Sequence, residues 1–128
     1  MIKDVFALDT SGIIAYLADE KGADEVSKVL PQCVIPFICL SELYYIIFSK
    51  RGRAQADRIY GIVKGWGLET LYPNERVILN AARIKAVYRL GISDSYIASF
   101  ALEYQITLLT KDNDYRMLRD EIKVQFIG

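Results

Sequence analysis

The stretch Val5-Phe6-Ala7-Leu8-Asp9-Thr10-Ser11-Gly12 determines the fold expected of this 128-residue chain. Its first four residues are apolar, and a polar turn follows them directly. Ile13, Ile14 and Leu17 then continue at the spacing of an amphipathic helix. This succession predicts a buried strand, a tight turn and a helix, which is the opening of an α/β fold.

The alternation of strands and helices continues along the rest of the chain. The expected strands are short apolar runs at residues 5–8, 33–35, 68–71, 106–109 and 124–127. The first expected helix ends near residue 17. The other expected helices cover residues 23–30, 40–49, 54–64, 75–88, 93–104 and 114–118. Because the strands are continuously apolar, we expect a single domain over residues 1–128. Its fold would be a three-layer α/β/α sandwich with a central parallel sheet of four to five strands.

The composition limits the chemistry that this chain can perform. It contains no histidine, which excludes Ser-His-Asp triads, histidine-based ribonuclease chemistry and zinc sites held by histidine. An enzyme of this composition would depend on carboxylates, Lys, Tyr, Cys or a hard metal ion held by oxygen ligands. The formal net charge of zero argues against non-specific coating of nucleic acid, but it is compatible with a local basic patch.

The sequence shows no sign of a membrane span or an export signal. A spanning helix needs roughly 20 apolar residues, and the best candidate, residues 29–49, is interrupted by two prolines and Glu42. The first residues lack the pattern of a signal peptide. Cys33 and Cys39 lie among apolar residues, so we expect buried free thiols rather than a disulfide. We therefore expect a cytoplasmic protein with no membrane partner.

Three apolar segments each contain a single charged residue, and in each case it is a carboxylate. These are Asp9 within residues 5–18, Glu42 within 29–49 and Asp94 within 90–102. An isolated carboxylate in a core costs several kcal/mol unless a proton, a cationic side chain or a metal ion compensates it. Because no Lys or Arg lies close to these acids in their segments, we expect the carboxylates to converge on a shared divalent cation or to share a proton.

Each carboxylate also has an ordinary structural explanation. Asp9 could accept hydrogen bonds from backbone amides of its own turn. Asp94 could be the N-cap of a helix, and Glu42 could lie on an exposed stripe of its helix. The segment 110–115 is polar and turn-like, so its two acids carry little information alone. Its position after a predicted strand, where ligands of parallel sheets bind, makes Asp112 a stronger candidate.

Four segments, in this order and at this spacing, resemble the PIN domain family, and most closely its stand-alone VapC-like toxin ribonucleases. They are Leu8-Asp9-Thr10-Ser11, Leu40-Ser41-Glu42-Leu43, Ile92-Ser93-Asp94-Ser95-Tyr96-Ile97-Ala98 and Leu109-Thr110-Lys111-Asp112-Asn113-Asp114-Tyr115. The resemblance extends over essentially the whole chain, and the ordered set of segments is more specific than any single one. One departure is Tyr115, where the family more commonly has Phe, and we expect it to matter little for packing.

The resemblance implies endonucleolytic cleavage of RNA with Mg²⁺ or Mn²⁺. It assigns an acidic quartet of Asp9, Glu42, Asp94 and Asp112, with Asp114 as a less regular fifth acid. Asp9 and Asp94 would ligate metal directly, while Glu42 and Asp112 would ligate a second ion or orient its waters. A metal-bound water would attack the phosphate in line and leave 5′-phosphate and 3′-hydroxyl ends.

Other residues are candidates for contact with the RNA. Lys50, Arg51 and Arg53 could hold flanking phosphates, although a solvated turn between helices explains them equally well. Ser11 and Thr110 could hydrogen-bond water or phosphate. The resemblance also implies a homodimer, and a toxin would have an antitoxin partner that could insert an Arg among the acids.

Three alternative functions are compatible with the sequence. A related nuclease could act on DNA or flap structures, but this chain is too short to include an arch or clamp. A PIN-type nuclease could process RNA without any antitoxin. A catalytically silent binding module or a receiver-like phosphate domain could share the α/β layout. Intact acids at all four positions argue against a silent module, and a receiver has no role for Glu42 or Asp94.

Overall fold

A five-stranded parallel sheet forms the centre of the computed structural model, which describes residues 4–128. The strands are β1 (Phe6–Leu8), β2 (Cys33–Pro36), β3 (Thr70–Leu71), β4 (Thr107–Thr110) and β5 (Val124–Phe126). Their order in the sheet is β3-β2-β1-β4-β5, and every neighbouring pair is parallel. The expected α/β fold with a central parallel sheet is therefore confirmed.

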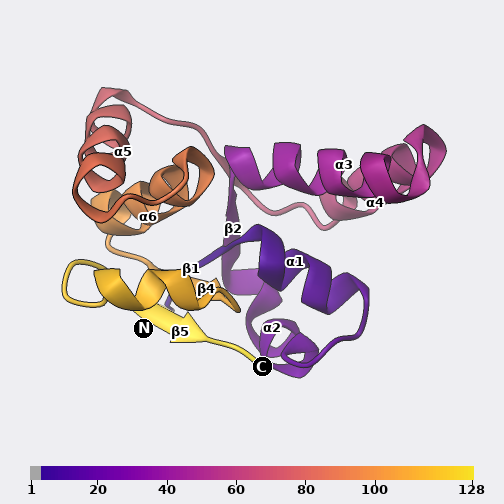
Figure 1. Ribbon diagram of the computed structural model, residues 1–128. Coiled ribbons are helices and arrows are strands. Elements are labelled where there is room, and N and C mark those ends of the chain that lie inside the picture. Colours follow the sequence, from indigo (N-terminus) through magenta and orange to yellow (C-terminus); the bar gives the residue numbers. More distant parts are fainter. Residues whose placement is uncertain (1–3) are drawn as a thin grey trace.

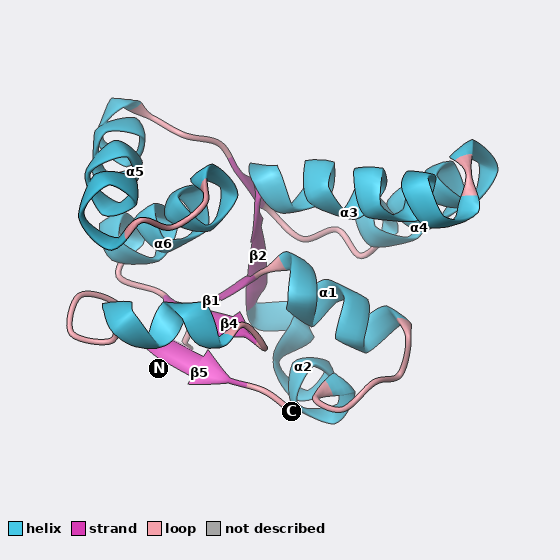
Figure 2. Ribbon diagram, in the orientation of Figure 1, coloured by secondary structure: helices cyan, strands magenta, loops and turns pink. Residues whose placement is uncertain are grey.

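Helices cover the sheet and account for most of the chain (Figure 1). They are α1 (Thr10–Leu17), α2 (Ala23–Val29), α3 (Phe37–Arg51), α4 (Arg53–Gly65), α5 (Glu75–Tyr88) and α6 (Ile92–Tyr104), with 3₁₀ turns η1 (Leu30–Gln32) and η2 (Asn113–Leu118). Helix α3 packs along α4, and α5 packs along α6. Figure 2 shows the α3–α4 pair extending well beyond the strands.

The neighbouring strands β1 and β4 are buried in the core of the protein. Ala7 and Leu8 of β1 and Leu108 and Leu109 of β4 are completely buried. Burial of a side chain as large as leucine contributes about 1.5–3 kcal/mol. Because both strands end at the same edge of the sheet, the residues that follow them are held firmly next to each other.

Several boundaries differ from the sequence-based expectation. Helix α3 begins directly after Pro36 rather than at residue 40, because the proline ring fixes φ at −58° and needs no backbone donor at the helix start. Gly91 does not end α5; Arg89 does so in a left-handed conformation, and Gly91 is the N-cap of α6. Strand β3 contains only Thr70–Leu71.

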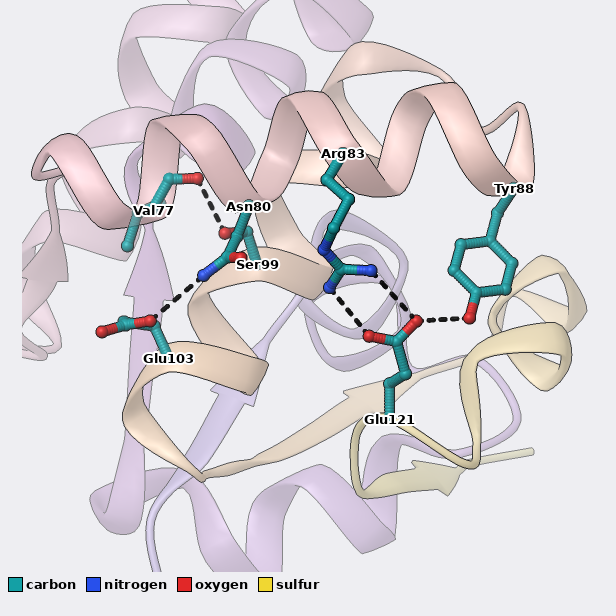
Figure 3. A network of polar contacts seen from close by, with 7 residues as sticks. All are labelled: Val77, Asn80, Arg83, Tyr88, Ser99, Glu103 and Glu121. Carbon is teal, nitrogen blue, oxygen red and sulfur yellow. Dashed lines mark hydrogen bonds and ion pairs between the residues drawn. The ribbon is translucent and has the colours of Figure 1, made fainter.

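Polar contacts fasten α5 to its neighbours (Figure 3). The buried Ser99 hydroxyl of α6 donates a hydrogen bond to the Val77 carbonyl of α5 at 2.7 Å. Near the other end of α5, Arg83 forms an ion pair with Glu121 at 2.8 Å, and the Tyr88 hydroxyl donates to the same carboxylate. Glu121 follows η2, so these contacts hold the segment between η2 and β5 against α5.

Two further expectations concern the cysteines and the membrane. Cys33 and Cys39 are buried free thiols, as predicted. Burial raises the pKa of Cys33 to about 12, and the pKa of Cys39 also lies well above its ordinary value. Over residues 4–128, no helix combines the length and apolar character needed to cross a membrane.

Candidate metal-dependent active site

The four carboxylates singled out in the sequence line one cavity of about 240 Å³. Asp9 follows β1 and is the N-cap of α1, and Asp112 follows β4 and is the N-cap of η2. Glu42 projects from α3, and Asp94 projects from the first turn of α6. The cavity therefore lies at the carboxyl ends of the central strands, where parallel sheets place their ligands.

Asp9 is the most buried of these acids, with only 4% of its surface exposed. Its Oδ1 accepts hydrogen bonds from the Ser11 hydroxyl at 2.7 Å and the Gly12 backbone N–H at 2.9 Å. The Thr110 hydroxyl donates to Oδ2. Burial raises the pKa of Asp9 to about 6, although these hydrogen bonds oppose the rise. Asp9 thus caps its helix, as the simpler explanation predicted, and still remains an uncompensated carboxylate.

Glu42 is half-buried and is held by a residue that the sequence did not single out. The Thr10 hydroxyl of α1 donates to Glu42 Oε1 at 2.8 Å, which joins the first turn of α1 to α3. Thr10 carries no sequence signal beyond its place beside Asp9. Its partner lies 32 residues further along the chain, so only the fold reveals the contact.

Asp94 lies within the first turn of α6 and is not its N-cap, so the capping explanation is wrong. Gly91 occupies the cap position and makes no side-chain cap bond. The Tyr115 hydroxyl donates to Asp94 Oδ1 at 3.1 Å. Burial raises the pKa of Asp94, and the charges of neighbouring acids add to this effect.

Asp112 and Asp114 complete the acidic group from the side of η2. Carboxylate oxygens of Asp94, Asp112 and Asp114 all lie within 4.8 Å of one another. Asp112 also lines the cavity, whereas Asp114 is exposed and does not. The Asp112 carboxylate accepts the backbone N–H of Asp114 at 2.9 Å, which fixes the turn.

The donor set fits a hard divalent cation. The ion pairs among residues 4–128 join Arg76 to Glu103, Arg83 to Glu121 and Lys111 to Glu20, and none includes an acid of the cavity. Like charges this close repel one another, and partial burial strengthens the repulsion. A divalent cation with carboxylate ligands relieves both effects, so these residues suit Mg²⁺ or Mn²⁺ better than any soft metal.

The hydroxyls of Ser11 and Thr110 are already engaged with the protein. Ser11 donates to Asp9 and accepts the backbone N–H of Lys111 at 2.9 Å. Thr110 donates to Asp9 and accepts the backbone N–H of Asp112 at 3.0 Å. They tie the ends of β1 and β4 together around Asp9. Direct contact of either hydroxyl with substrate stays a prediction.

A larger hollow of about 350 Å³ adjoins the acidic cavity and shares Ile14 and Ile46 with it. Lys50 and Arg51, at the end of α3, line this hollow together with apolar side chains of α1, α3 and α4. Arg53 is not among its lining residues and lies close to Tyr44. Two of the three residues expected to hold phosphates thus line the hollow that adjoins the acidic cavity.

The sheet and its carboxylates define an α/β protein with a candidate divalent-metal site. The family model that matches the sequence, over residues 6–121, is the PIN domain. The chain belongs to the PIN domain family. Its acids at the carboxyl edge of the sheet, Asp9, Glu42, Asp94 and Asp112, line one cavity, and their roles stay predictions.

Solved structures share the fold of this chain. VapBC-1 from nontypeable Haemophilus influenzae is 26% identical, with a TM-score of 0.76 over 95% of this chain and 97% of that chain. VapBC-5 from Mycobacterium tuberculosis is 22% identical, with a TM-score of 0.73 over 98% of each chain. VapBC2 from Rickettsia felis, bound to a promoter DNA fragment, is 17% identical, with a TM-score of 0.77 over 95% of this chain and 98% of that chain. No curated protein matches the sequence.

Proposed function

We propose that this chain is a single-domain, metal-dependent endoribonuclease and the toxin of a toxin–antitoxin pair. The observation that carries the nuclease proposal is the cavity lined by Asp9, Glu42, Asp94 and Asp112, none of which forms an ion pair within residues 4–128. Proteins of the PIN family are typically metal-dependent nucleases. The toxin proposal is supported by the similar structures, one of which is described as a member of the VapBC family of toxin–antitoxin systems.

Asp9 and Asp94 would hold the metal ion directly, and Glu42 and Asp112 would hold a second ion or orient its waters. Asp114 would contribute from the exposed rim. When bound, Mg²⁺ or Mn²⁺ supplies a water of lowered pKa and stabilises negative charge on the phosphate oxygens. Cleavage by water would leave 5′-phosphate and 3′-hydroxyl ends.

The chain's own side chains prepare this site in two ways. Hydroxyls of Thr10, Ser11 and Thr110 orient Glu42 and Asp9 through hydrogen bonds without adding positive charge that would compete with a cation. Lys50 and Arg51 would hold flanking phosphates of the RNA, at the hollow that adjoins the acids.

The proposed partners are a second copy of the chain and a small antitoxin. An antitoxin that inserts an Arg among the acids would replace the cation and block the site, because guanidinium pairs strongly with carboxylates. Expression of the chain alone should arrest growth, and co-expression of a protein encoded beside it should restore growth. The cytoplasmic location stays a prediction.

A cleavage assay tests the chemistry. Wild type, Asp94→Asn and the exposed-acid control Asp24→Asn are incubated with a mixed RNA pool and with single- and double-stranded DNA, in Mn²⁺ or in excess chelator. We expect RNA cleavage by wild type and by the control, loss of at least roughly 100-fold with Asp94→Asn, and no cleavage in chelator. Equal activity of Asp94→Asn and wild type, or activity in chelator, would contradict the proposal. Preferential cleavage of DNA would contradict the proposed ribonuclease activity and indicate a deoxyribonuclease instead.

A further inference from the structure

Tyr115 is a completely buried residue whose hydroxyl donates a hydrogen bond to Asp94, one of the acids that line the cavity. Its exposed fraction is 0%, and its ring belongs to the hydrophobic core. The hydroxyl donates to Asp94 Oδ1 at 3.1 Å, across 21 residues of sequence. A phenylalanine would fill the same apolar space, so the core alone does not require this hydroxyl.

The position of Tyr115 in η2 links two acids that come from different elements. Asp112 caps the turn, and Tyr115 belongs to the same turn, so the backbone that places one also places the other. Asp94 comes from α6, and the tyrosine hydroxyl is its side-chain donor within residues 4–128. One short turn therefore sets Asp112 directly and Asp94 through a hydrogen bond.

The geometry leaves Asp94 suited to bind a cation. The hydroxyl occupies Oδ1, and no hydrogen bond within the described part of the chain uses Oδ2. A phenol is neutral, so it orients the carboxylate without cancelling its charge. An arginine or lysine at this place would orient Asp94 equally well but would compete with the metal ion.

We infer that Tyr115 is a positioning residue that presets Asp94 against Asp112 and Asp114 for divalent-metal binding. This inference rests on the proposed metal-dependent function and goes beyond it, because it assigns a role to the hydroxyl of Tyr115, a residue that departs from the family pattern. Groups that orient metal ligands typically contribute roughly 10–100-fold to metal affinity or activity.

Direct measurement of Mn²⁺ binding tests the inference without any RNA. The dissociation constant is measured by electron paramagnetic resonance of free Mn²⁺ for wild type, Tyr115→Phe and Tyr88→Phe. Tyr88→Phe is the matched control, because it removes a hydroxyl that donates to Glu121, outside the cavity (Figure 3). We expect Tyr115→Phe to raise the dissociation constant roughly 10-fold or more and Tyr88→Phe to leave it unchanged. Thermal unfolding of the metal-free proteins checks that the variants fold.

A double-mutant cycle identifies the route of the effect. If Tyr115 acts through Asp94, Tyr115→Phe should have no further effect on residual Mn²⁺ binding in an Asp94→Asn background. An equal loss in both backgrounds, or wild-type affinity in Tyr115→Phe, would overturn the inference and leave the proposed function intact. Absence of Mn²⁺ binding by the folded wild type would instead remove the proposed function and the inference together.

Discussion

Asp9 is held in an environment that opposes its own charge. Burial raises its pKa from 3.8 to about 6, even though Thr110, Ser11 and Gly12 all donate to it. The protonated form is therefore favoured in the fold. The contribution of the protonated Asp9 carboxyl to the free energy of unfolding is fully present below about pH 4 and is lost as the pH rises through about 6. A shift of this size corresponds to about 3 kcal/mol.

Asp9→Asn should therefore stabilise the metal-free protein at neutral pH. The amide keeps an oxygen for Ser11 and Gly12 but carries no charge to desolvate. We expect its free energy of unfolding to exceed that of wild type by about 1–3 kcal/mol at pH 7.5 and to match it near pH 4. Urea unfolding in chelator at both pH values measures the difference. A variant less stable than wild type at pH 7.5 would show that the hydrogen bonds outweigh burial.

At the scale of single residues, the carboxylates of the cavity could be predicted from the sequence, but the hydroxyls that donate to them could not. Asp9, Glu42 and Asp94 could be singled out because each is the lone charge of an apolar segment, and burial of such a charge demands an explanation. The hydrogen bonds of Thr10 and Tyr115 to these acids could not be predicted, because a hydroxyl near the start of a helix or turn is common. Its partner is defined only when distant segments meet.

Helix α3 shows how an element can be recognised while its ends are not. Its apolar pattern predicted a helix over 40–49, but the helix extends over Phe37–Arg51. Pro36 ends the strand and immediately precedes the helix, so no connecting loop is needed. The added residues at the carboxyl end of the helix, Lys50 and Arg51, line the hollow that adjoins the acidic cavity, where we propose that they hold phosphates.

The end of α3 should contribute to RNA binding through charge alone. Replacement of both Lys50 and Arg51 by Ala should weaken the binding of every RNA sequence alike, and it should reduce the slope of log affinity against log salt by up to about 2, one for each phosphate that is no longer neutralised. Lys64→Ala is the control, because Lys64 is exposed at the end of α4 and lines neither cavity. Fluorescence anisotropy with labelled RNA in Ca²⁺ over a range of salt measures both quantities. An unchanged slope would mean that these cations form only a solvated turn.

For the molecule as a whole, the class of fold followed from the sequence, but the order of its strands did not. Continuous apolar runs predicted parallel strands buried on both faces, and β1 and β4 are buried in this way. Their pairing across about 100 residues has no local signal, since it depends on how the intervening helices pack. The edge strands β3 and β5 are less buried than β1 and β4.

Because the proposed ligands come from segments spread over the whole chain, metal binding should stabilise the complete fold. A ligand at 100 times its dissociation constant stabilises the folded state by about 2.7 kcal/mol when the unfolded chain does not bind it. The unfolded chain separates Asp9 from Asp112 by most of its length and cannot form this site. Differential scanning calorimetry of wild type should show an unfolding midpoint that rises by several degrees with saturating Mn²⁺ and returns in chelator. Asp94→Asn should show a much smaller rise, and Asp24→Asn should match wild type. Equal rises in all three proteins would place the cation elsewhere on the surface, because a site that lacks one of its proposed ligands could not bind it equally well.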